Sequence, residues 1–97
     1  MPKAYLVACY REVKDPDVLA AYAVLAGPTV TANGGRILAR GGRVTSLEGG
    51  IEERTVLIEF DNFEAAVAHY HSEAYQKAIA ALGDAAIRDM RVVEAVE

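Results

Sequence analysis

The sequence predicts an α+β protein in which strands and helices follow one another in the order β-α-β-β-α-β. Four stretches show apolar residues at every second position, two regions open with residues that cap helices, and glycine clusters separate these elements. The chain has 97 residues, which is the length of one small domain. We therefore expect residues 1–97 to form a single domain.

The spacing of the apolar residues changes between the first predicted strand and the first predicted helix. Residues 3–13 alternate, and both alternating sets are mainly apolar, which predicts a strand inside a sheet. Asp15 can accept hydrogen bonds from the free N–H groups of a helix, and Pro16 suits its first position. The helix is expected to run to about Ala26, to be kinked or interrupted by the Gly-Pro pair that follows, and to stop at residues 33–35 after one more turn.

Two further strands are expected in the middle of the chain. Residues 36–40 alternate, and Gly41-Gly42 predicts a bulge or bend, with residues 43–48 as a candidate continuation of the same strand. Gly49-Gly50 then predicts a turn into the strand of residues 54–60. Both faces of that strand are again largely apolar.

The second helical region is expected to consist of two helices. Asp61 or Asn62 can cap the first helix, and Glu64 is placed to complete a capping box with Asp61. Ser72 can cap again, which predicts a break and a second helix ending at a Gly-Asp pair. Residues 88–96 alternate and form the last predicted strand.

This order of elements is the ferredoxin-like arrangement, an antiparallel sheet with its helices on one face. The other face of such a sheet is usually polar, but residues 3–13 and 54–60 are apolar on both faces. No residues remain in the chain to cover that second face. We therefore expect a homodimer in which two copies pack through their helix-free sheet faces, in agreement with a hydrophobic content of 53%.

Composition argues against several classes of function. Fourteen acidic and ten basic residues give a net charge of −4, which does not favour nucleic acid or an anionic membrane. Cys9 is the single cysteine, and no signal peptide or long apolar run is recognisable, so the cytoplasm is the expected compartment. His69 and His71 are two positions apart and would point in different directions on a helix. We expect no metal and no cofactor.

Candidate catalytic residues lie where the two later helices meet. His71 could act as a general base, because its ordinary pKa is near neutrality, or it could be a capping or solvent-facing histidine. Tyr75 lies on an inward helical face and could direct its hydroxyl into a cavity between the helices and the sheet. A buried tyrosine bonded only to backbone is the alternative. His69 and Glu73 lie one turn apart and could pair.

Candidate ligand-binding residues are Tyr22, Arg54 and Tyr70. Tyr22 lies on the inward face of the first helix, and Tyr70 adjoins the helix junction. Arg54 begins an apolar strand, where its guanidinium could hold a carboxylate or an enolate oxygen of a ligand. A burial argument predicts that Arg54 needs some partner, and Glu59 or another acid of the chain is the alternative to a ligand.

Taken together, these features resemble one protein family over nearly the whole chain. The residues that carry the resemblance are Asp15-Pro16, Tyr22, Gly34-Gly35, Arg40-Gly41-Gly42, Leu47-Glu48-Gly49, Arg54, Glu59-Phe60 and the run from Tyr70 to Gln76. The sequence resembles the DUF1330 family, which implies the dimeric α/β barrel fold. Where that family usually carries Trp, this chain has His69, a difference expected to alter the pocket.

Two functions remain open at this point. The resemblance implies no particular reaction for the family, although its barrel relatives include enzymes that act on small organic molecules without a cofactor. We therefore expect a pocket for a small organic molecule, aromatic, anionic or enolisable, between helices and sheet, with a cofactor-independent enzyme as one version of this function. The alternative is a homodimeric binding or stress-associated protein that catalyses nothing.

Overall fold

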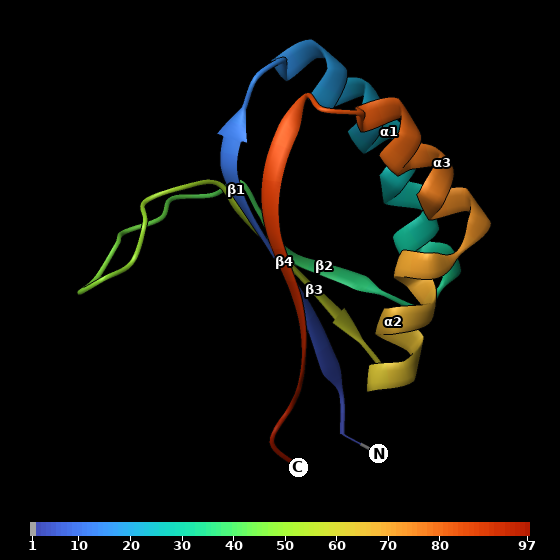
Figure 1. Cartoon of the computed structure of the whole chain (residues 1–97). Coiled ribbons are helices and arrows are strands. Elements are labelled where there is room, and N and C mark those ends of the chain that lie inside the picture. The colour runs from blue at the N-terminus through green and yellow to red at the C-terminus, as the bar shows by residue number, and fades with distance from the viewer. Residues whose placement is uncertain (1) are drawn as a thin grey trace.

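The structure is a computed structural model that describes residues 2–97, and it contains four strands and three helices. Figure 1 shows a curved sheet with every helix on one side of it. The elements in chain order are β1 (Ala4–Val13), α1 (Pro16–Ala32), β2 (Arg36–Arg40), β3 (Thr55–Phe60), α2 (Phe63–His71), α3 (Glu73–Leu82) and β4 (Ala86–Glu94).

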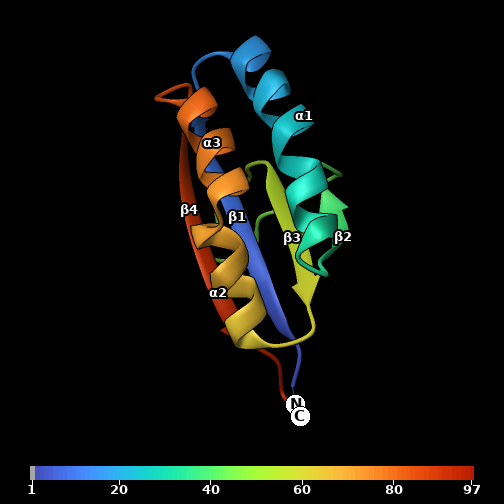
Figure 2. The same cartoon turned by 90° about the vertical axis from the view of Figure 1, so that its right-hand side faces the viewer.

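The strands lie in the order β2-β3-β1-β4, and each neighbouring pair is antiparallel. Figure 2 shows α1 crossing over β2 and β3, whereas α2 and α3 lie over β1 and β4. This arrangement confirms the predicted α+β ferredoxin-like fold.

The two faces of the sheet differ in burial. On the helix face, the alternate residues of β1 and β3 are buried beneath the helices: Ala4, Leu6, Ala8, Tyr10, Val56, Ile58 and Phe60. On the opposite face, which we call the open face, the intervening residues are half-buried: Tyr5, Val7, Cys9, Thr55, Leu57 and Glu59. Within one chain the strands are therefore covered on one face only, unlike the burial on both faces that their composition predicts.

Helix α1 is longer than predicted and runs through Pro28 without a break. Asp15 caps its start as expected, because its carboxylate accepts from the backbone N–H groups of Asp17 and Val18. Pro28 lies on an exposed part of the helix. Water can therefore bond the carbonyl that loses its N–H donor there, and the expected interruption does not occur.

Residues 41–54, which we call the arm, contain no strand. The prediction that residues 43–48 continue β2 was therefore wrong. β2 pairs with β3 only as far as Arg40, and the arm then leaves the sheet. Figure 1 shows it projecting from the side opposite the helices, where it finds no second strand with which to pair.

The second helical region is capped by Asn62 rather than by Asp61. Asn62 accepts from the N–H of Ala65 at 2.8 Å, whereas Asp61 accepts from Arg36. The predicted capping box therefore does not form. Ser72 caps α3 as predicted and separates it from α2.

Among residues 2–97, no helix combines the length and the apolar character that crossing a membrane would require.

Candidate functional site: a cavity between helix and sheet

A cavity of about 270 Å³ lies between α1 and the helix face of the sheet. Most of its wall is apolar, and it includes Leu6, Leu19, Val30, Val56 and Ile58. A mainly apolar wall with a few converging polar groups is typical of small-molecule sites. The polar groups here are arginines, tyrosines and one histidine.

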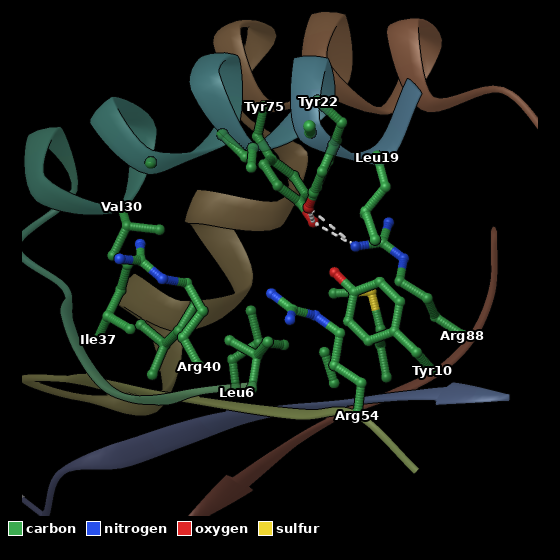
Figure 3. A pocket seen from close by; sticks show the side chains of 18 of the residues that line it. Leu6, Tyr10, Leu19, Tyr22, Val30, Ile37, Arg40, Arg54, Tyr75 and Arg88 are labelled. Atoms are coloured by element: carbon green, nitrogen blue, oxygen red, sulfur yellow. Dashed lines mark hydrogen bonds between the residues drawn. The ribbon is translucent and has the colours of Figure 1, made fainter. Parts of the chain in front are cut away.

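Two tyrosines and an arginine form the cluster at one end of this cavity. The hydroxyls of Tyr22 on α1 and Tyr75 on α3 lie 2.7 Å apart and share a hydrogen bond. Arg88 on β4 donates from Nη1 to both oxygens, at 2.8 Å to Tyr22 and 3.3 Å to Tyr75. Figure 3 shows these bonds, with the tyrosines reaching down from the helices and Arg88 reaching up from the sheet. We call these three residues the Tyr–Arg cluster.

Burial and mutual contact fix the charge states within the Tyr–Arg cluster. Burial raises the pKa of Tyr22, the neighbouring Tyr75 raises it further, and Arg88 opposes them only in part. Burial alone would lower the pKa of Arg88, but its contacts with Tyr22 and Tyr75 outweigh burial, and the pKa is raised. At neutral pH the cluster is therefore a neutral phenol pair beside a permanent cation.

Two further arginines reach the cavity from the two ends of the arm. Arg40 is the last residue of β2, Arg54 immediately precedes β3, and both line the cavity. Figure 3 shows the Arg54 guanidinium between the sheet and the tyrosine hydroxyls. Gly41 adopts a positive φ of 70°, and a Cβ at this position would overlap the guanidinium of Arg54. Glycine therefore leaves the room that Arg54 occupies.

The Tyr10 ring lies close to both Arg54, at the end of the arm, and Arg88 of the Tyr–Arg cluster. The guanidinium carbon of Arg54 lies 5.5 Å from the centre of the Tyr10 ring, and that of Arg88 lies 5.7 Å from it. Both distances are within the range of cation–π attraction. One aromatic ring therefore holds two like charges close to the same cavity.

None of these cavity arginines meets a carboxylate within residues 2–97. The lining contains no Asp or Glu, and the ion pairs of the described chain involve other cations. The predicted alternative, a pair between Arg54 and Glu59, was wrong, because Glu59 bonds Arg36 at 2.9 Å. Arg54 is also exposed, so water reaches its charge and the burial argument does not apply to it. That argument applies instead to Arg88.

His69 lies deep in the cavity wall, fully buried between the helices and the sheet. Its Nε2 is 3.1 Å from the hydroxyl of Thr29, which itself donates to the carbonyl of Ala26. Nε2–H is therefore the donor, and Nδ1 has no hydrogen-bond partner in the described chain. Burial lowers the pKa of His69, which keeps the ring neutral. The predicted pairing of His69 with Glu73 does not form.

The remaining predicted residues lie elsewhere. His71 is exposed at the end of α2 and does not line the cavity. It borders a second hollow between α2 and β4, together with Tyr70, Val67 and Arg91. Tyr70 also packs against the Tyr75 ring, with ring centres 5.6 Å apart. The structure thus brings Tyr22, Arg54 and Tyr75 together and leaves His71 and Tyr70 outside the cavity.

Sequence reasoning missed Arg88 and Tyr10, and it considered Arg40 as the end of a strand and as part of the family resemblance. Arg88 alternates with Met90 and Val92 on the helix face of β4, so a single charge in an apolar series was the available signal. Its position opposite Tyr10 depends on strand register, which the sequence does not specify. Among residues 2–97, no group of three or more His, Cys, Asp or Glu side chains is placed to hold a metal.

The profile of a family described as "Domain of unknown function (DUF1330)" matches residues 3–96. A protein of unknown function from Rhodopseudomonas palustris is 21% identical, with a TM-score of 0.71 over 97% of this chain and 81% of that one. SnoaB, a cofactor-independent oxygenase from Streptomyces nogalater, is 11% identical, with a TM-score of 0.64 over 100% of this chain and 96% of that one. A dimeric ferredoxin-like protein of unknown function from Thermobifida fusca is 14% identical, with a TM-score of 0.63 over 97% and 92% of the two chains.

No curated protein matches the sequence. At these identities the solved structures support the fold alone. The family profile covers nearly all residues of the chain, and its match agrees with the ferredoxin-like topology of the sheet. This chain therefore belongs to the DUF1330 family.

Proposed function

We propose that the cavity between α1 and the sheet binds a small organic anion. The observation that carries this proposal is the wall itself: three guanidinium groups face an apolar space that contains no carboxylate. Arg40 and Arg54 lie at the ends of the arm, where they can hold a carboxylate, and the apolar wall can hold the rest of the molecule. A volume of about 270 Å³ exceeds the roughly 150 Å³ of a cavity that holds benzene. One ring with a short acidic side chain fits that space.

The test is calorimetric titration with 3-phenylpropanoate and, as the neutral counterpart, 3-phenylpropanamide. The wild type is expected to bind the acid and not the amide. Arg54→Gln should weaken binding of the acid by about tenfold to a hundredfold, because a charge-assisted hydrogen bond is lost. Arg54→Lys should weaken it less, since an ammonium keeps the charge without the bidentate geometry.

Arg43→Gln is the matched control, because Arg43 is an exposed arginine of the arm that does not line the cavity. This variant should bind the acid as the wild type does. Equal affinity for the acid and the amide, or equal loss in the Arg43 and Arg54 variants, would contradict the proposal.

Catalysis on the bound anion is a second version of this function. Tyr22 stays protonated because burial raises its pKa, and His69 stays neutral because burial lowers its pKa. A hydrogen-bond donor and a neutral imidazole with an unpaired Nδ1 thus border one cavity, and the imidazole is the group that can take a proton from carbon. SnoaB shows that this fold can hold an oxygenase that uses no cofactor.

The predicted general base His71 stays a prediction, since it borders only the second hollow. Exchange of the carbon-bound protons of phenylpyruvate into deuterated water, followed by NMR, separates the two histidines. Loss of catalysed exchange in His69→Gln alone favours the cavity, and loss in His71→Ala alone favours the second hollow. No exchange above the buffer rate in the wild type would leave a binding protein without this activity.

We also propose that two copies pair through the open face, as the sequence predicts. The apolar residues of that face are only half-buried in one chain, and the arm projects on the same side with Leu47 and Ile51 exposed by 76% and 59%. A second sheet would cover both, in an interface on the order of 2,000 Å². Sedimentation at micromolar concentration should give twice the 10.4 kDa of the chain, and a folded 10.4 kDa species would contradict the dimer.

A further inference from the structure

The Tyr–Arg cluster has more hydrogen-bond donors than acceptors. Tyr22 and Tyr75 bring two phenolic hydrogens, and the bond between their oxygens uses only one. The second phenolic hydrogen has no acceptor among the described residues, and Arg88 approaches both oxygens as a donor. Both tyrosines are almost fully buried, at 6% and 2% exposure. A buried donor without an acceptor is costly, so an acceptor from outside the chain belongs at this position.

The neighbouring charges specify what kind of acceptor it is. Arg88 is a half-buried cation whose hydrogen-bond partners within residues 2–97 are neutral phenols. Donors that converge beside an uncompensated cation stabilise an oxygen that carries, or develops, negative charge. A ketone oxygen that becomes an enolate has this property, whereas a hydroxyl would add yet another donor.

The cluster is also separate from the place proposed for the carboxylate. Arg54 and Arg88 approach the same Tyr10 ring, 5.5 Å and 5.7 Å from its centre, but Arg54 comes from the end of the arm and Arg88 from β4. Both arginines line the same cavity, so a ligand with two separate oxygens could contact the two guanidinium groups with different oxygens. A ligand with a carboxylate alone would leave the cluster without its acceptor.

Building on the proposed anion site, we propose that Tyr22, Tyr75 and Arg88 form an oxyanion subsite and that the ligand is a small oxo acid. Its carboxylate lies near Arg40 and Arg54, and its ketone or enolate oxygen accepts from the cluster. An aryl or alkyl group fills the apolar part of the cavity. The tyrosine whose hydrogen is not used between the two hydroxyls donates to this oxygen, and neither tyrosine acts as a nucleophile.

Two ligands that differ in one functional group test this assignment. Phenylpyruvate and 3-phenylpropanoate share the ring, the chain length and the carboxylate, and only phenylpyruvate has the ketone oxygen. The wild type is expected to bind phenylpyruvate at least about tenfold more tightly, since the cluster gains its missing acceptor. In the double variant Tyr22→Phe/Tyr75→Phe this preference should fall to about twofold or less.

The same titrations separate the inference from the function on which it rests. The double variant should keep its affinity for 3-phenylpropanoate, which also shows that the cavity has folded. Tyr5→Phe, a tyrosine of the open face, is the matched control and should keep the preference. Equal wild-type affinity for both acids, or a preference that survives in the double variant, overturns the oxyanion subsite alone. Failure of both acids to bind the wild type overturns the anion site itself.

Discussion

The arginines on the two faces of the sheet differ in whether they bond a carboxylate. On the open face, Arg11, Arg36 and Arg91 each bond a carboxylate, whereas on the helix face Arg40, Arg54 and Arg88 bond none within residues 2–97. The open-face arginines are partly exposed, with 39% to 74% of each side chain accessible. Residue type alone therefore does not distinguish the two sets of arginines, whereas the absence of a carboxylate partner on an apolar wall does, and this absence supports the proposed anion site.

The difference follows from what each face must achieve. An open-face arginine that bonds a carboxylate has its charge compensated within the chain, so a second protein surface that covers the pair meets no uncompensated cation. On the helix face, arginine is left with aromatic rings and phenols, which are weaker partners than a carboxylate. The positive charges of the open-face arginines are balanced by carboxylates of the chain. Those of the helix-face arginines are not, and the proposed ligand would balance them.

The strongest test of this contrast places an unpaired charge on the open face. Leu57 lies there between Val7 and Ala39, without a cation opposite it in either neighbouring strand. Leu57→Glu should abolish the proposed dimer, because two like charges in a symmetric apolar interface cost on the order of several kcal/mol. Sedimentation should then show monomer or unfolded chain.

Leu25→Glu is the control for that experiment, since Leu25 is 49% exposed on α1, away from the open face. It should sediment as the wild type does. If both variants kept the wild-type mass, the open face would not be an interface.

A second test concerns the buried neutral histidine of the helix face. Burial lowers the pKa of His69 in the folded state, so the unfolded chain takes up the proton first as the pH falls. This contribution to stability is fully present above the ordinary pKa of about 6.5 and is lost as the pH drops below it. Because a single proton is involved, the free energy of unfolding can change through His69 by at most about 1.4 kcal/mol per pH unit.

The measurement is urea unfolding at about pH 7.5 and about pH 5.5, at fixed protein concentration, for the wild type and His69→Phe. The wild type should lose more stability than the variant between the two pH values. Because the carboxylates are common to both proteins, the difference isolates His69. If the wild type and His69→Phe lost the same amount of stability, burial would not lower the pKa of His69, and the prediction would be wrong.

The smallest expected effect comes from removing a paired arginine. Arg36 lies on the edge strand β2 and bonds Glu59 and Asp61, and the exposed fractions of the Arg36 and Asp61 side chains, 44% and 69%, let water screen their charges. Arg36→Gln should change the melting temperature only slightly and leave 3-phenylpropanoate affinity unchanged. Arg54→Gln should show the reverse, with 3-phenylpropanoate binding weakened and the melting temperature maintained. A loss of binding in Arg36→Gln would remove the distinction between the two faces.

Local signals in the sequence were sufficient for most of the fold. Asp15 and Ser72 cap the helices that they were expected to cap, and the period of two in residues 3–13 and 54–60 located the central strands. The arm was misread because residues 43–48 were expected to continue β2 beyond Gly41-Gly42, and a strand continues only where a partner strand exists. Pro28 was misread because its cost depends on exposure, which the sequence does not show.

The site was less predictable, because it depends on register and on contacts between distant elements. Tyr22 and Tyr75 were expected to face inward, but their mutual bond joins residues 53 positions apart. Arg88 enters the site because antiparallel register places it opposite Tyr10. The choice between His69 and His71 depended on the rotation of one helix, and that rotation buries His69 and exposes His71.

The concentration of unpaired cations at one cavity also affects how a ligand would arrive. The whole chain carries a net charge of −4, so at long range it repels anions. Within a Debye length, about 8 Å at physiological ionic strength, the guanidinium groups of Arg40, Arg54 and Arg88 dominate the local potential. A small monoanion experiences little of the repulsion and most of this attraction, whereas a polyanion experiences both along its length. If the cavity binds an anion as proposed, this charge distribution would favour small anions over polyanions during association, before any contact in the cavity distinguishes between them.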